Sequence, residues 1–262
     1  QRSKPFAMNQ NWISMKILNS LTILPPNMDK VEVLKRQAGI EACKFVKSGM
    51  KIGLGTGSTV KYTVIELGRR ISEEGLEIVG VPTSLATEKL ATKVGIPLVE
   101  LSECTHLDIV IDGADEFDSN YNLIKGGGAA LLREKIVAQE SLSMIVVADE
   151  RKMVGTLGAF PLPIEITPFS HQSTIRQLST LLDSRVNCRM AGDNPVVTDN
   201  GNYIADAHCG PKLSNPEALE VEILKIAGVV QVGLFNNMCD VVILASSTGV
   251  ETKVNPNGRL AD

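Results

Sequence analysis

Short apolar runs alternate with amphipathic stretches over residues 29–160, and this alternation limits the fold more than any other feature of the sequence. Each apolar run has the length of a strand, and the stretches between them mostly show helical spacing. Candidate strands lie at residues 51–54, 77–81, 97–101, 107–111 and 144–148. This order predicts an α/β fold with a doubly wound, mostly parallel sheet of Rossmann-like arrangement. Because ligands bind such sheets beyond the carboxyl ends of the strands, the polar residues after each strand are the first candidates for a site.

The pattern changes after residues 161–163, which read Pro-Leu-Pro. A strand, a helix, two strands joined by a turn at residues 199–201, a second helix and a final strand follow. Their expected bounds are residues 164–167, 175–182, 186–189, 196–208, 216–227 and 229–235. The order βαββαβ is typical of a ferredoxin-like α+β domain. Two last strands, at residues 240–245 and 250–254, are expected to rejoin the first sheet.

The expected domains are therefore a Rossmann-like catalytic domain of residues 29–160 and 238–262 and a smaller ferredoxin-like domain of residues 161–237. Residues 1–28 carry lysine and arginine but no acidic residue. We interpret them as an N-terminal tail that is flexible or is the remnant of a leader or an expression vector. An acid-poor, serine-containing segment is weakly similar to an organelle transit peptide, although it lacks the usual richness in arginine.

Charge and cysteine content narrow the function classes. A formal net charge of −4 argues against a broad nucleic-acid or anionic-membrane footprint. The sequence has no apolar run of the roughly 18 residues that a membrane span needs. The five cysteines form no Cys-X-X-Cys pair, which favours reduced thiols over a disulfide framework or a zinc site. We therefore expect a cytoplasmic protein without nucleic-acid or membrane partners, or an organellar one if residues 1–28 are a transit-peptide remnant.

Residues 112–135 concentrate the groups that carry chemistry. Asp112 and Asp115 follow the strand at residues 107–111, and Lys125 precedes three glycines and a helical pattern. Glu134 lies within that helix, where its neighbours three and four residues away are apolar. Such a setting raises the pKa of a carboxyl group towards the range useful for a general base. Each residue alone is more commonly a turn former or a solvated charge, and it is their clustering that predicts a site.

A second candidate follows the strand at residues 51–54, where the sequence reads Gly53-Leu-Gly-Thr56-Gly-Ser58-Thr59 before a helical pattern. Backbone N–H groups and hydroxyls at a helix N-terminus favour a phosphate group. A dinucleotide site is the rival interpretation. It fails because Ser58 replaces the last glycine of that fingerprint, and because the next strand ends without an acidic residue for a ribose.

Other kinds of site find little support in the sequence. His106, His171 and His208 are scattered and have no recognisable ligand spacing, so no metal site is predicted. The adjacent His208 and Cys209 would point to opposite faces of a strand and suit a structural pair better than a nucleophile with its base. The nucleophile motif of serine hydrolases, Gly-X-Ser-X-Gly, is absent.

The motifs together resemble those of the ribose-5-phosphate isomerases of the A type. The resemblance extends from about residue 30 to residue 254 and leaves out the N-terminal tail. Its motifs are GLGTGSTV (53–60), ATEKL (86–90), DGADE (112–116), IKGGGAALLREKIVA (124–138), PLPIE (161–165), VVTDNGN (196–202) and GVVQVGLF (228–235).

This resemblance implies an aldose-ketose isomerase that interconverts ribose 5-phosphate and ribulose 5-phosphate in the non-oxidative pentose phosphate pathway, without a cofactor or metal. It implies that Glu134 is the general base, that Asp112 and Asp115 contact the substrate and assist ring opening, and that Lys125 stabilises negative charge on the reacting oxygens. The substrate-binding residues that it implies are Thr56, Gly57, Ser58, Thr59, Asp112, Gly113, Ala114, Asp115, Lys125, Gly126, Gly127, Gly128, Lys152 and Lys35. A homodimer or homotetramer is expected on the same ground.

Alternative functions remain open at this point. A related sugar-phosphate deaminase or isomerase, or a non-catalytic sugar-phosphate sensor, would use a similar sheet. A relative of the coenzyme A transferases would use a glutamate as a nucleophile.

Overall fold

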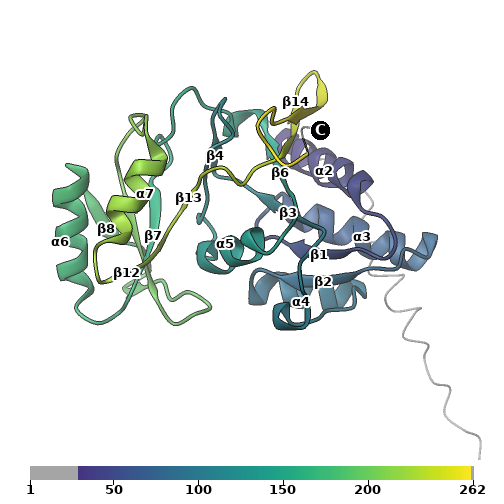
Figure 1. Cartoon of the computed structure of the whole chain (residues 1–262), viewed down its shortest axis with the longest axis horizontal. Helices are drawn as coiled ribbons and strands as arrows, with labels where there is room; N and C mark the ends of the chain where they lie inside the picture. The colour runs from purple at the N-terminus through teal and green to yellow at the C-terminus, as the bar shows by residue number, and fades with distance from the viewer. Residues whose placement is uncertain (1–28, 261–262) are drawn as a thin grey trace, which may run out of the picture.

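The computed structural model describes residues 29–260, so the expected tail at residues 1–28 lies outside the described residues. A six-stranded sheet and a four-stranded sheet lie side by side, and helix α5 (Leu131–Gln139) lies between them (Figure 1). The α/β class with a mainly parallel sheet and smaller antiparallel sheets is confirmed. The domain boundaries near residues 160 and 237 stay predictions.

The six-stranded sheet has five parallel strands and one antiparallel edge strand. In spatial order its strands are β15 (Gly249–Val254), β14 (Val241–Ser246), β6 (Met144–Asp149), β3 (Ile109–Gly113), β1 (Lys51–Leu54) and β2 (Val79–Pro82). The chain moves outward from β1 to β2 and then returns to β3 on the other side of β1. This reversal creates a crevice at the carboxyl ends of β1 and β3, where doubly wound sheets bind ligands.

Helices cover both faces of this sheet because side chains on its strands alternate between them. In β3, Ile109 and Ile111 pack towards three helices on one face, whereas Val110 packs towards α5 on the other. The three helices are α2 (Lys30–Ala42), α3 (Val60–Glu74) and α4 (Leu85–Val94), and short 3-10 helices are found at η1 (Cys43–Phe45), η2 (Leu101–Glu103) and η3 (Glu150–Lys152). None of the helices within residues 29–260 is both long and apolar enough to cross a membrane.

The four-stranded sheet has the antiparallel order expected of a ferredoxin-like unit. Its elements along the chain are β7 (Leu162–Ile166), α6 (His171–Leu182), β8 (Val186–Cys188), β11 (Tyr203–Ala207), α7 (Pro216–Leu224) and β12 (Val229–Val232). The strands lie in the order β12-β7-β11-β8, so the two halves of the unit interleave. Between β8 and β11, the short strands β9 (Met190–Ala191) and β10 (Asn194–Pro195) form a hairpin, and a bridge between Val197 and Tyr203 closes the expected turn at residues 199–201.

The expected single strand at residues 229–235 is wrong, because the chain changes sheets at Gly233. The Gly233 N–H donates to Pro163 O in the four-stranded sheet, while Gly233 O accepts from Lys125 N. A side chain at this position would lie about 2.1 Å from Lys125 O. After Gly233 the chain enters a small antiparallel sheet made of β13 (Leu234–Phe235), β5 (Leu123–Ile124) and β4 (Glu116–Phe117). This small sheet joins the two larger units.

The strand expected at residues 97–101 is also wrong in extent. Only Leu98 pairs with β2, through a single parallel bridge to Gly80, and the chain then turns into η2. Two hydrogen bonds hold this bridge, from Gly80 N–H to Pro97 O and from Val99 N–H to Gly80 O. Pro97 has no N–H, so the ladder cannot extend on the side before Leu98. The segment then crosses the α5 face of the sheet towards β3.

We predict that Gly53→Ala destabilises the protein, because Gly53 allows α5 to approach the sheet. A methyl group there would lie 2.6 Å from Val137 Cγ1 and 2.7 Å from Val110 Cγ2. Overpacking of this kind costs about 1–3 kcal/mol in the free energy of unfolding, which denaturant titration measures. The control is Gly155→Ala, whose methyl group would meet no atom within 4 Å. Equal stabilities for the two variants would contradict this account of α5 packing.

Candidate active site

A cavity of about 230 Å³ opens at the carboxyl ends of β1 and β3, where the reversal of the sheet creates a crevice. Its lining comes from the loop after β1, the loop after β3, α5 and η3. It also includes the loop of residues 126–128 before α5, called the glycine loop below. Its lining residues are Thr56, Gly57, Ser58, Thr59, Gly113, Ala114, Asp115, Lys125, Gly126, Gly127, Gly128, Glu134 and Lys152. The structure thus brings together all the expected site residues except Asp112 and Lys35.

Three buried charges lie at the inner end of this cavity. Lys125 Nζ is 3.0 Å from Asp112 Oδ2 and 3.3 Å from Glu134 Oε2, and it donates a hydrogen bond to Gly113 O at 2.5 Å. All three side chains are almost completely buried. One ammonium group therefore faces two carboxylates in surroundings with little water, where electrostatic interactions are strong.

The surroundings raise the pKa of Glu134 to about 8. Burial is the largest cause, the negative charge of Asp112 adds to it, and Lys125 opposes both. Burial also raises the pKa of Asp112, against the opposing effects of Lys125 and two backbone N–H groups. The geometry separates the two carboxylates: Asp112 accepts those backbone hydrogen bonds, whereas the Glu134 carboxylate accepts no backbone hydrogen bond within residues 29–260. Glu134 is therefore the group suited to take up and release a proton near neutral pH.

Asp112 lies beneath the cavity and does not reach its wall. Its Oδ1 accepts hydrogen bonds from Thr56 N at 3.0 Å and from Gly113 N at 2.7 Å, and its side chain is fully buried. A side chain at Gly55 would lie 2.3 Å from this oxygen, so glycine is required there. The structure assigns Asp112 the support of the loop after β1 and of Lys125, and it gives no support to the expected substrate contact.

Asp115 does line the cavity, and it is joined to the glycine loop. Its Oδ2 accepts a hydrogen bond from Gly127 N at 2.7 Å, and a side chain at Gly127 would collide with the carboxylate. Gly126 has φ +110° and Ala129 has φ +58°, so the loop turns sharply before α5 begins. The three glycines thus let the backbone pass close to a carboxylate that faces the cavity.

The loop after β1 also contributes hydroxyl-bearing residues to the lining of the cavity. Ser58 and Thr59 lie just before α3, which begins at Val60, and they line the cavity together with Thr56. Backbone N–H groups at a helix N-terminus and nearby hydroxyls attract anions. Thr56 Oγ1 lies within hydrogen-bonding distance of three further hydroxyls, those of Thr83 (2.7 Å), Ser84 (2.8 Å) and Thr87 (3.3 Å). The turn at residues 83–84 therefore supports Thr56 from below.

Of the two remaining lysines, only Lys152 reaches the cavity. It ends η3, after β6, and forms no ion pair within residues 29–260. Lys35 lies on α2 and does not line the cavity. Its Nζ is 2.7 Å from Glu32 Oε1, so the expected phosphate contact at Lys35 gains no support from this arrangement.

Three consecutive charged residues of α5 point in three directions, as their 100° spacing requires. Arg133 donates hydrogen bonds to Asn200 Oδ1 and Asp199 O in the turn after β10. Glu134 faces the cavity, and Lys135 Nζ is bound by Glu220 Oε1, Gln231 Oε1 and Val232 O at the four-stranded sheet.

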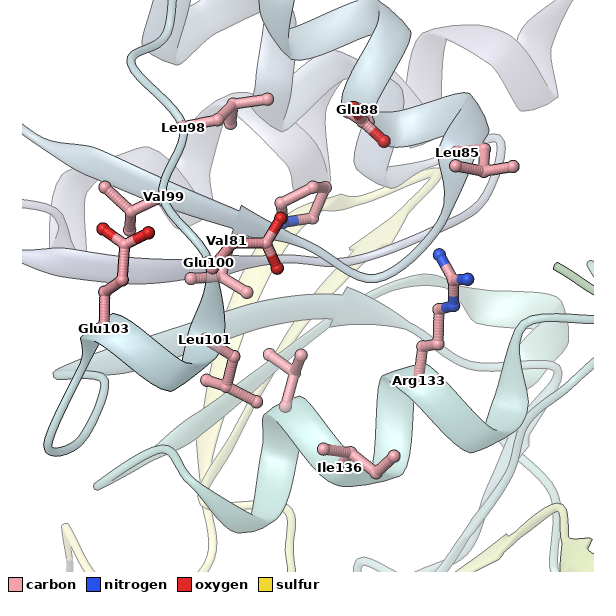
Figure 2. A pocket seen from close by; sticks show the side chains of 12 residues that line it. Val81, Leu85, Glu88, Leu98, Val99, Glu100, Leu101, Glu103, Arg133 and Ile136 are labelled. Carbon is pink, nitrogen blue, oxygen red and sulfur yellow. The ribbon is translucent and has the colours of Figure 1, made fainter. Parts of the chain in front are cut away.

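A larger cavity, of about 580 Å³, borders α5 but lacks a buried lysine beside a carboxylate (Figure 2). It lies between α4, the segment at residues 98–103 and the side of α5 that carries Arg133 and Ile136. Its glutamates at positions 88, 100 and 103 are exposed to solvent and no lysine lines it. The smaller cavity is therefore the candidate active site.

Sequence reasoning missed three residues that support the site. Thr87 follows Ser84 by one helical turn, at the spacing of an N-cap hydrogen bond, and this spacing is a signal that could have found it. Phe235 is buried, and its ring centroid lies 5.3 Å from Lys125 Nζ and 5.1 Å from Lys135 Nζ. Arg189 contacts the glycine loop from the four-stranded sheet, and nothing in the local sequence indicates it.

Within residues 29–260, no group of three or more histidine, cysteine, aspartate or glutamate side chains is arranged to hold a metal ion.

The sequence matches one family over most of its length. A sequence model of ribose 5-phosphate isomerase A (phosphoriboisomerase A) matches residues 79–249. Ribose-5-phosphate isomerase A of Cereibacter sphaeroides is 48% identical over 232 residues, which cover 86% of this chain and 92% of that protein. The protein of the same name from Bifidobacterium adolescentis is 46% identical over 232 residues, which cover 88% and 100%.

Solved structures agree with the sequence comparison. A structure of D-ribose-5-phosphate isomerase in complex with phospho-erythronic acid has a TM-score of 0.83 and 42% identity, and the match covers 87% of this chain and all of that one. The structure of ribose 5-phosphate isomerase A from Methanocaldococcus jannaschii has a TM-score of 0.81 and 42% identity, with 85% and 99% covered. The chain belongs to the ribose 5-phosphate isomerase A family.

Proposed function

We propose that this protein interconverts D-ribose 5-phosphate and D-ribulose 5-phosphate as a step of the non-oxidative pentose phosphate pathway. One observation carries the proposal: a buried glutamate with a raised pKa lies beside a lysine in a small cavity that is also lined by hydroxyl-bearing residues at a helix N-terminus. An isomerase of this kind needs a base at the carbons that exchange a proton and a separate site for the phosphate.

In the proposed reaction, the carboxylate of Glu134 removes the proton from C2 of the open-chain aldose. The electron pair forms a C1–C2 double bond, and the aldehyde oxygen gains the negative charge of an enediolate. Lys125, buried next to Glu134, stabilises that charge. Glu134 then returns the proton to C1 while the hydroxyl proton of O2 passes to O1, so that C2 becomes the ketone and O1 becomes a hydroxyl. Asp115 contacts the sugar hydroxyls and assists ring opening, while Asp112 keeps Lys125 charged and in place.

The phosphate of the substrate is proposed to lie at the loop of residues 56–59. Ser58 and Thr59 offer hydroxyls at the start of α3, and Lys152 supplies a positive charge that forms no ion pair within the described part of the chain. A relative was solved in complex with phospho-erythronic acid, which is itself a phosphate ester, so the proposal agrees with the ligand named for that relative.

The direct test is an assay with ribose 5-phosphate, a metal chelator and no added cofactor, in which formation of the ketose is followed. A sugar-phosphate sensor would bind ribose 5-phosphate without turnover, and a deaminase would release ammonia from an amino-sugar phosphate. Either of these results without isomerisation would overturn the proposal. A transferase that uses Glu134 as a nucleophile would form a glutamyl thioester with coenzyme A, which mass spectrometry detects.

We further propose that the protein acts in the cytoplasm as a homodimer or homotetramer. The five cysteines are all unpaired, which suits a reducing compartment. An organelle remains the alternative address. Light scattering of the purified protein measures the assembly, and a monomer would contradict this part of the proposal.

We predict that Glu134→Gln lowers kcat by about 10²–10⁴, the usual contribution of a general base. Glutamine keeps the size of the side chain but cannot accept the proton. Steady-state kinetics measure the effect, and denaturant titration shows whether the variant is folded. The matched control is Glu140→Gln at the exposed end of the same helix, where no change in kcat is expected. Turnover by Glu134→Gln close to that of the wild type would contradict the assignment.

The pH dependence of kcat/KM provides a second prediction. Because Glu134 must be deprotonated to act as a base and its pKa is raised to about 8, kcat/KM should rise with pH and level off above that value. Below it, the loss should be about tenfold per pH unit. A sugar phosphate titrates near pH 6, so the profile is fitted above that pH. A kcat/KM that stays level from pH 6 upwards, as the ordinary pKa of glutamate near 4.3 requires, would show that burial does not act on Glu134 as described.

We predict that Ser58→Ala raises KM for ribose 5-phosphate by about tenfold or more while kcat changes little, because a hydrogen bond to a charged group contributes about 1.5–3 kcal/mol. Ser102→Ala, in exposed η2, is the control and should leave KM unchanged. If Ser58→Ala also has the wild-type KM, the phosphate lies elsewhere in the cavity.

A further inference from the structure

Arg189 connects the ferredoxin-like sheet to the glycine loop of the candidate active site. It follows β8, and its Nη1 donates hydrogen bonds to Gly126 O at 2.9 Å and to Gly127 O at 3.0 Å. The other side of the guanidinium is held by Asp206 of β11, with Nε 2.8 Å from Oδ2 and Nη2 2.5 Å from Oδ1. A planar guanidinium group is suited to this double contact, which an ammonium group cannot reproduce.

The backbone of Arg189 is fixed as firmly as its side chain. Arg189 N donates to Ile204 O at 2.7 Å, and Arg189 O accepts from Val196 N at 2.9 Å. The side chain is mostly buried, as is that of Asp206. The Arg189–Asp206 pair is therefore a rigid projection from the sheet and not a mobile surface ion pair.

The contact determines which way the glycine peptides face. In a trans peptide the C=O of one residue and the N–H of the next point in opposite directions. Since Arg189 binds the carbonyls of Gly126 and Gly127, the N–H groups of Gly127 and Gly128 point away from it. The Gly127 N–H accordingly donates to Asp115 Oδ2 at 2.7 Å. Gly128 lines the cavity, and its N–H contacts no acceptor within residues 29–260.

The glycine loop needs such an external support. Glycine backbones adopt many conformations, and Gly126 is at φ +110°, while Ala129 is at φ +58°, where L-residues are uncommon. The loop has no side chains beyond Cβ with which to hold itself, and α5, which follows, has no side-chain cap at Ala130. Arg189 is the side chain that binds its carbonyls.

We propose that Arg189, held by Asp206, is a positioning residue for the isomerisation. By binding the carbonyls of residues 126 and 127 it turns Asp115 and the Gly128 N–H towards the reacting end of the sugar. The ferredoxin-like unit thus takes part in catalysis without touching the substrate. This inference rests on the proposed isomerase function and adds to it a role for a residue outside the cavity.

The test replaces Arg189 and separates kcat from KM. Arg189→Met should lower kcat by about 10- to 100-fold, because displacement of reacting groups by about 1 Å costs as much as 10²-fold. KM should change less than about threefold, since the hydrogen bonds of Arg189 go to the glycine loop and not to the proposed phosphate loop at residues 56–59. Arg189→Lys should recover little of the lost kcat. Asp206→Asn should also lower kcat. The double variant, Arg189→Met with Asp206→Asn, should show no larger fall in kcat than Arg189→Met alone.

The matched control is Arg259→Met. Arg259 also joins a carboxylate, Asp240, to main-chain carbonyls, at Ser141 and Met238, but it lies outside the cavity lining. Its loss should reduce the free energy of unfolding and leave kcat unchanged. A wild-type kcat in Arg189→Met, or a fall in kcat no larger than that in Arg259→Met at matched folded fraction, would overturn the proposal.

A second readout does not depend on turnover. The ¹⁵N–¹H resonances of Gly127 and Gly128 should move in Arg189→Met and stay in place in Arg259→Met. If the wild type fails to isomerise ribose 5-phosphate, the proposed function fails, while these resonances still report whether Arg189 sets the loop. Unmoved resonances in an active protein would reject the role of Arg189 alone.

Discussion

A buried ammonium group between two carboxylates is the interaction on which the rest of the site depends. Lys125 can remain charged away from water only because Asp112 and Glu134 lie within 3.3 Å of it. The excess of negative charge, together with burial, raises the pKa of Glu134. The fold protects this arrangement from solvent through α5 on one side, the loops after β1 and β3 on another, and the ring of Phe235 beneath Lys125.

Much of the fold and of the candidate site could be predicted from the sequence, because the residues that indicate them lie close together along the chain. Strand β1 runs into a glycine-rich turn, and Asp112 ends a run of apolar residues, so both loops were expected at one edge of the sheet. The apolar neighbours of Glu134 within its own helix indicated a raised pKa before any tertiary contact was known. The βαββαβ order likewise follows from spacing alone, and the observed strand order agrees with it.

What could not be predicted depends on contacts between distant segments. Nothing near Arg189 in the sequence shows that Gly126 and Gly127 will lie against it, because 62 residues separate Arg189 from Gly127. The last ferredoxin-like strand is divided at Gly233, where the Gly233 N–H donates to Pro163 O. The spacing of apolar residues cannot indicate such a long-range hydrogen bond. The expected substrate contact of Asp112 stays a prediction, but its full burial could not be predicted, because burial depth cannot be deduced from a residue type.

The three directions taken by residues 133–135 have a consequence for how this chain tolerates change in length. Each side chain of α5 depends on helical phase, since one added or removed residue turns all later side chains by about 100°. A single-residue insertion between the glycine loop and Glu134 would direct that carboxylate towards the four-stranded sheet, as Lys135 is now, and a deletion would direct it towards the turn at Asp199, as Arg133 is now. The number of residues between Gly128 and Glu134 is therefore constrained as strictly as the types of those residues. Surface loops would accept a one-residue insertion, but the segment between Gly128 and Glu134 would not.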